Sequence, residues 1–222
     1  MREGRCCKIQ IALGLGLLIA GCGVVGCSVT GVEGNGVEGS AQRKLGAFST
    51  VSVGGAFALD LRRGSPQKVV VRGDANLLPL VETTVESGRL RVRCRKSVSP
   101  RRGLRLEVVT PTLDGLALSG AAKGTVHGVD SKRFVLRISG AAKLALDGKA
   151  DALSVTSSGA AKVDARALKV RAAKVHASGA AKVDVDASET LDVQASGAVA
   201  VSYSGSPKLT QSLSGACRLT KR

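Results

Sequence analysis

The chain has 222 residues, which is enough for an export signal, a short linker and one domain of about 180 residues. Aromatic residues make up only 2% of the chain and glycine occurs 28 times, which argues against a globule built on aromatic anchors and favours a narrow, repetitive stack. The formal net charge of +16 favours anionic partners such as lipid headgroups, lipopolysaccharide or acidic polysaccharide. The alternative is a basic surface that serves no partner.

Residues 1–21 are typical of a bacterial export signal. Arg2, Arg5 and Lys8 precede an apolar run over residues 9–20, and this run of about 12 residues is too short to span a bilayer. We therefore expect this segment to direct export rather than to form part of the fold.

The apolar run ends in Ile19-Ala20-Gly21-Cys22, which resembles the lipobox of bacterial lipoproteins. The resemblance implies cleavage before Cys22 and attachment of a diacylglycerol to its sulfur. Because Gly23 follows the cysteine, it also points to the outer membrane in a cell that has one. Cys27 is a weaker second candidate, and an uncleaved anchor is a third. Residues 22–44 are rich in glycine, which predicts a flexible tether between membrane and domain.

Beyond residue 110 the chain repeats itself. The sequence Ser-Gly-Ala-Ala-Lys occurs four times and two degenerate copies follow, with first residues at Ser119, Ser139, Ser158, Ser178, Ser196 and Ser214. The spacing of 18 to 20 residues indicates that each unit is one turn of a stacked array.

Apolar and polar residues alternate on both sides of each Ser-Gly, as in Phe134, Leu136 and Ile138. A period of two predicts two short strands per unit, and the signature of leucine-rich repeats is absent from the sequence. The predicted fold is therefore all-β: a single-stranded, right-handed parallel β-helix (β-solenoid) with about 19 residues per turn. The recurring glycine marks a corner where a Cβ would clash.

Residues 45–110 show the same alternation without the motif. We interpret them as earlier, irregular coils, so that the predicted domain covers residues 45–222.

The order of motifs resembles that of the adhesin family with a head GIN domain. The resemblance rests on the opening from Phe48 to Leu61, on Gly73-Asp74-Ala75-Asn76-Leu77, on Gly88-Arg89-Leu90-Arg91-Val92 and on the recurring Ser-Gly. This chain departs from the family in having Ala then Lys after Ser-Gly-Ala, which makes its corners unusually basic. The resemblance implies a single-stranded β-helix and an envelope location, and it carries over no ligand and no catalytic residue.

The repeat places one lysine per turn at the same outward position. These residues, Lys123, Lys143, Lys162 and Lys182, form a linear array that would suit a linear polyanion. In water, two unit charges one strand spacing apart repel by only about 1 kcal/mol, so such a column is also tolerated without a function. Both interpretations remain open at this point.

A second basic face is predicted on one strand, where Arg89, Arg91, Arg93 and Arg95 alternate with inward-facing residues. Stacking aromatics are scarce and the chain is exported, so we expect no nucleic acid partner. An anionic envelope polymer or a membrane surface is favoured.

No catalytic or metal-binding constellation stands out, and no cofactor is expected. The two histidines, His127 and His176, are predicted to be surface residues, and the inward-facing Cys94 and Cys217 are expected to lie too far apart for a disulfide. The sequence thus predicts an envelope lipoprotein with a binding or adhesion module. The alternatives are a structural protein that stacks end to end and, less favoured, a β-helical carbohydrate-active enzyme. The oligomeric state is left open.

Overall fold

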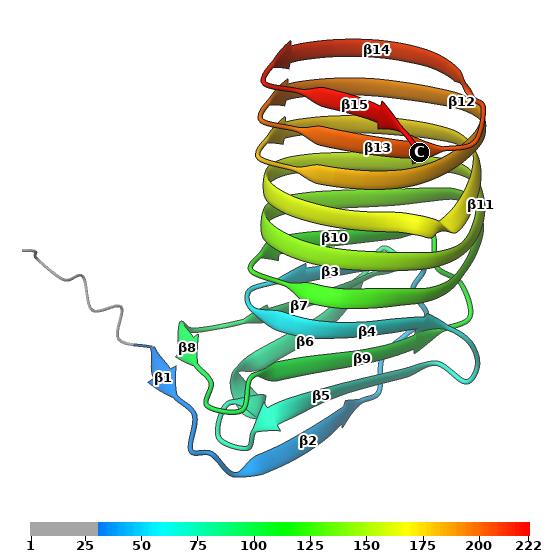
Figure 1. Cartoon of the computed structure of the whole chain (residues 1–222). Helices are drawn as coiled ribbons and strands as arrows, with labels where there is room; N and C mark the ends of the chain where they lie inside the picture. Colours follow the sequence, from blue (N-terminus) through cyan, green and yellow to red (C-terminus); the bar gives the residue numbers. More distant parts are fainter. Residues whose placement is uncertain (1–30) are drawn as a thin grey trace, which may run out of the picture.

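The computed structural model describes residues 31–222 (Figure 1). The predicted export signal and Cys22 lie outside the described residues. The described part is all-β, with a single short 3-10 helix, η1 (Leu78–Leu80). Its strands are β1 (Val32–Glu33), β2 (Glu38–Arg43), β3 (Thr50–Gly54), β4 (Phe57–Arg63), β5 (Lys68–Asp74), β6 (Val81–Glu86), β7 (Arg89–Cys94), β8 (Val98–Ser99), β9 (Leu104–Thr110), β10 (Gly115–Gly120), β11 (Lys123–Gly179), β12 (Lys182–Gly197), β13 (Ala200–Ser204), β14 (Lys208–Gly215) and β15 (Arg218–Lys221).

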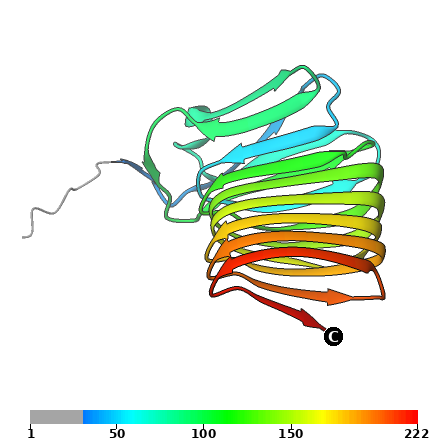
Figure 2. The same ribbon diagram turned by 90° about the horizontal axis from the view of Figure 1, so that it is seen from above.

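The strands form a nearly closed stack with two sides (Figures 1 and 2). Along one side the order of hydrogen-bonded neighbours is β6, β7, β3, β10, β11, β12 and β14. Along the other side it is β2, β5, β9, β4, β11, β12, β13 and β15. The long strands β11 and β12 belong to both sides because each bends at a corner and continues across (Figure 1).

The corner at the recurring Ser-Gly consists of stacked glycines. Gly120 is in register with Gly140, and Gly179 with Gly197. The φ angle of Gly140 is 109°, a conformation that side chains rarely adopt, and a Cβ there would lie 2.6 Å from the carbonyl oxygen of Gly120. The same close approach recurs at Gly159, Gly179, Gly197 and Gly215, so the recurring Ser-Gly of the sequence marks the position where successive corners touch.

The core is a column of small and medium apolar side chains between the two sides. Alternate residues point inward, as in Phe134, Leu136 and Ile138, which are at most 2% exposed. Valine, leucine and alanine fill most inward positions. The alternation in the sequence therefore predicted the core correctly.

The sheet is mixed, which corrects the prediction of parallel coils throughout residues 45–110. Strands β2 and β5, β5 and β9, and β6 and β7 pair antiparallel. The turn between β6 and β7 consists of Ser87 and Gly88, with φ angles of 49° and 71°. A two-residue turn with positive φ at both positions closes a hairpin, and a hairpin can only be antiparallel. Antiparallel strands therefore occupy the N-terminal end of the stack (Figure 2).

Part of the predicted tether is ordered, which corrects the boundary at residue 45. Strand β2 pairs with β5, and β1 pairs with β8. The buried carboxylate of Asp74 accepts hydrogen bonds from the backbone amides of Gly36, Arg101 and Arg102 at 2.8, 2.9 and 3.2 Å. Burial raises the pKa of Asp74, but these amides and the Arg102 charge lower it by more, so the net shift is downward.

The neighbouring Asn76 holds the same segment. Its side-chain amide donates to the carbonyl oxygen of Glu33 at 2.7 Å, and its side-chain oxygen accepts from the amide of Asn35 at 3.0 Å. The Gly-Asp-x-Asn-Leu motif is thus an attachment point for the segment that precedes the predicted domain.

Candidate functional site

One line of outward positions carries basic residues in register on the side that contains β4. Pairing places Lys162 beside Lys182. The amide of Lys143 donates to the carbonyl oxygen of Ala122 at 2.9 Å, which sets Lys143 beside Lys123. We call this line the cationic column, and its members in order along the stack are Arg105, Ala58, Lys123, Lys143, Lys162, Lys182, Ala200 and Arg218.

The six cations of the column are exposed, and neighbouring positions are about 4.8 Å apart. Within residues 31–222 none of the six forms an ion pair with a carboxylate. The column is therefore a line of charge that no acid in the described part of the chain neutralises by direct contact.

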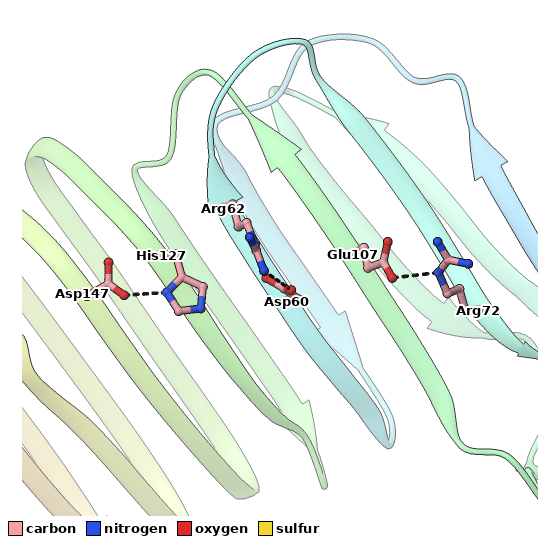
Figure 3. Close-up of polar contacts among 6 residues, drawn as sticks. All are labelled: Asp60, Arg62, Arg72, Glu107, His127 and Asp147. Atoms are coloured by element: carbon pink, nitrogen blue, oxygen red, sulfur yellow. Dashed lines mark hydrogen bonds and ion pairs between the residues drawn. The ribbon is translucent and has the colours of Figure 1, made fainter.

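At four of the eight positions a carboxylate lies two residues further along the strand, but an arginine outside the six binds each of these carboxylates. Glu107 binds Arg72 at 2.7 Å and Asp60 binds Arg62 at 2.9 Å (Figure 3). In the later turns, Asp164 binds Arg166 and Asp184 binds Arg222. These pairs leave the lysines of the column without a partner.

Two of these acids, Asp60 and Asp164, have lowered pKa values because of their arginines. The hydrogen bonds from Arg166 lower the pKa of Asp164 to about 2, although partial burial opposes the shift. The hydrogen bonds from Arg62 lower the pKa of Asp60 in the same way, again against burial. Each of these acids therefore forms its ion pair with an arginine rather than with a lysine of the column.

His127 is partly exposed, as expected for a surface residue, and it contacts a carboxylate. Its Nδ1 lies 2.6 Å from a carboxylate oxygen of Asp147, and the amide of Gly128 donates to the other oxygen at 2.7 Å (Figure 3). The amide of Gly128 is the main cause of the lowered pKa of Asp147, ahead of the contribution of His127. The geometry is that of a turn fixed by one carboxylate.

Carboxylates neutralise part of the second predicted basic face, so fewer of its arginines are free to bind an anionic partner. Arg89, Arg91, Arg93 and Arg95 are exposed on and just after β7, as expected from alternation. Glu82 on the neighbouring β6 binds Arg93 at 2.8 Å and Arg95 at 3.6 Å. Glu86 is the cross-strand neighbour of Arg89. The antiparallel hairpin, which the sequence analysis did not foresee, thus brings acids to the arginines.

A cleft of about 650 Å³ lies between this strand and the first corner of the stack. Arg93, Arg95 and Lys96 line it together with the backbone of Gly54 and Gly55. Two of its three cations share Glu82, so its charge is weaker than that of the column.

The structure brings together the four lysines and separates them from the four arginines on and just after β7. It also adds Arg105 to the lysine line. The sequence analysis did not include Arg105 in this line, because it did not pair the strand of Arg105 with that of Ala58. The alternation from Leu104 to Val108 could have shown that Arg105 faces outward, as the lysines of the column do.

Over residues 31–222, no cluster of three or more histidine, cysteine, aspartate or glutamate side chains is arranged to hold a metal ion. Cys94 and Cys217 are free thiols, and burial raises the pKa of Cys94. No helix in this part of the chain is long and apolar enough to cross a membrane.

Comparison with solved structures finds the same fold in three crystal structures of proteins named putative adhesins. The protein from Bacteroides fragilis is 17% identical with a TM-score of 0.69, and the match covers 86% of this chain and 99% of that one. The protein from Parabacteroides merdae is 15% identical with a TM-score of 0.52, covering 86% and 99%. The protein from Parabacteroides distasonis is 17% identical with a TM-score of 0.51, covering 87% and 100%.

No curated protein sequence matches the chain. The family model described as "Putative auto-transporter adhesin, head GIN domain" matches residues 47–207, which is most of the described part. The chain therefore belongs to the family that this model describes, the head GIN domain family.

Proposed function

We propose that this protein is a binding or adhesion module of the bacterial cell envelope, and that it contacts anionic polymers or surfaces through the cationic column. The observation that carries the proposal is the line of six exposed cations without a carboxylate partner in the described residues. A linear array of like charges attracts a linear polyanion along its whole length. In a bacterial envelope, anionic polysaccharide and lipopolysaccharide carry negative charges that could bind the cationic column.

The column depends on a regular winding, and we propose that residues 115–221 form a right-handed β-solenoid with about 19 residues per turn. Its support is the parallel register, in which Gly120 pairs with Gly140 and Gly197 pairs with Gly215. Right-handed winding is the rule for parallel strands joined in one sheet.

For localisation, we propose an exported lipoprotein anchored through Cys22, in the outer membrane where the cell has one. The support is the leader over residues 1–21 and the lipobox-like Ile19-Ala20-Gly21-Cys22. Replacing Cys22 with Ser should shift the protein from the membrane fraction to soluble or unprocessed forms. Equal membrane retention and equal lipid labelling of the variant would contradict the anchor.

The sequence is also compatible with two other functions, a structural role and an enzymatic one. A structural protein that stacks end to end would sediment faster as its concentration rises, whereas a binding module would not. A carbohydrate-active enzyme would release products from acidic glycans. Neither the family nor the three structural neighbours carries an enzyme name.

The proposed function is tested by measuring the binding of the purified full chain to acidic polysaccharide, lipopolysaccharide, polyphosphate and neutral polysaccharide at several salt concentrations. We expect binding to anionic polymers that weakens as salt rises and no binding to the neutral polymer. Absence of binding to every anionic polymer, or equal binding to the neutral one, would contradict the proposal.

A further inference from the structure

An exposed alanine stands beside each lysine of the cationic column. In the sequence Gly-Ala-Ala-Lys the second alanine is buried, whereas the first is exposed at the corner. The exposed alanines form a strip parallel to the column, which we call the alanine strip; its members are Ala121, Ala141, Ala160, Ala180, Ala198 and Ala216. Each turn therefore presents one methyl group and, in most turns, one cation.

The presence of a methyl group beside a cation favours one class of anionic ligand over another. A phosphodiester or polyphosphate chain offers charge but no apolar surface to a methyl group. A polysaccharide with one carboxylate on each sugar offers both, because the face of a sugar ring that carries C–H bonds is apolar. Adjacent strands are about 4.8 Å apart, which is close to the length of one sugar in an extended chain.

The direction of the ligand follows from the register. The column crosses the strands, and its ends are Arg105 on β9 and Arg218 on β15. Seven strand intervals separate the ends, which is about 34 Å at about 4.8 Å each. Only a ligand that runs along the stack can meet every cation.

Resting on the proposed function, we propose that the cationic column and the alanine strip together form a linear site for an acidic polysaccharide that carries one carboxylate per sugar. The chain of sugars lies along the stack from Arg105 to Arg218. A turn that carries a cation binds one carboxylate through it, and a turn that carries an exposed alanine binds one ring face through that alanine.

The column has two gaps, and they provide the test. Ala58 lies between Arg105 and Lys123, and Ala200 lies between Lys182 and Arg218. A linear site predicts that Ala58→Lys and Ala200→Lys each raise the affinity for a long polyuronate severalfold. The matched control is Gln194→Lys, which adds the same charge at an exposed position on the opposite side of the stack.

The experiment measures binding of the full chain and these variants to polyuronate oligomers of increasing length and to polyphosphate. We expect the affinity of the wild type to rise with length until the oligomer spans the column. Ala160→Gln, which places a polar side chain on the alanine strip, should weaken polyuronate binding and leave polyphosphate binding unchanged.

Each outcome decides between the two proposals. If the gap variants gain no more affinity than Gln194→Lys, the linear site is wrong while anionic binding stands. If polyphosphate binds more tightly than polyuronate of equal charge, or if Ala160→Gln affects both equally, the polysaccharide class is wrong. If no anionic polymer binds, the proposed function itself is wrong.

Discussion

Gly159 lies against Gly140, and a Cβ at Gly159 would come within 2.6 Å of the carbonyl oxygen of Gly140. Its φ angle of 118° adds a backbone conformation that alanine avoids. We expect Gly159→Ala to lower the free energy of unfolding by about 2 kcal/mol or more. The measurement is urea unfolding. Gly46→Ala is the control, because a Cβ there meets nothing within 4 Å. Equal stability of the two variants would show that the corner does not require glycine.

Asp74 should control the attachment of β1 and β2. Replacing Asp74 with Ala leaves the backbone amides of Gly36, Arg101 and Arg102 without their acceptor, so protection of the segment should be lost. Hydrogen exchange should speed up over residues 32–43 and much less over β12. Asp114→Ala, which removes an exposed carboxylate, is the control. Unchanged exchange over residues 32–43 would refute this role.

The ion pair of Asp164 and Arg166 gives stability a defined pH dependence. The pKa of Asp164 is lowered from 3.8 to about 2 in the folded protein, so the pair stabilises the fold above the unfolded pKa and this contribution is lost as the pH falls from about 4 to about 2. Asp164→Asn should be less stable than the wild type at pH 5, and the difference should vanish near pH 2. The effect will be small because Arg166 is 57% exposed.

The measurement is urea unfolding at a series of pH values, with Asp114→Asn as the control for an exposed carboxylate without an ion pair. A stability difference that stays constant from pH 5 to pH 2 would contradict the assignment of this window to Asp164.

The sequence predicted the inward residues and the register of the repeated segments, because each repeat contains the same alternation and the same Ser-Gly. Alternation around Phe134 identified the inward residues, and the Ser-Gly spacing placed Lys162 beside Lys182. These features are local, and stacking identical units brings identical residues into register.

The first half was predicted less well because its pairing depends on turns rather than on repeats. Alternation is the same in parallel and antiparallel strands, so it did not reveal the hairpin that brings Glu82 to Arg93. The glycine-rich composition of residues 31–40 suggested a tether, whereas Asp74 and Asn76, distant in sequence, bind this segment. The strip of exposed alanines was also missed, although the alternation that points each lysine outward places the second alanine of each pair inward and the first outward.

The most direct test of the account replaces Lys123, Lys143, Lys162 and Lys182 together with Gln. A control variant replaces four lysines outside the column, Lys44, Lys68, Lys132 and Lys208, and so has the same net charge. Both variants should keep their stability within about 0.5 kcal/mol, because all eight side chains are exposed.

The decisive measurement is the affinity of the two variants and the wild type for an acidic polysaccharide as a function of salt concentration. The account predicts that the column variant loses most of its affinity and shows a shallower salt dependence, whereas the control variant binds nearly as the wild type does. Unchanged affinity and salt dependence in the column variant, or an equal loss in both variants, would contradict the cationic column as the binding face.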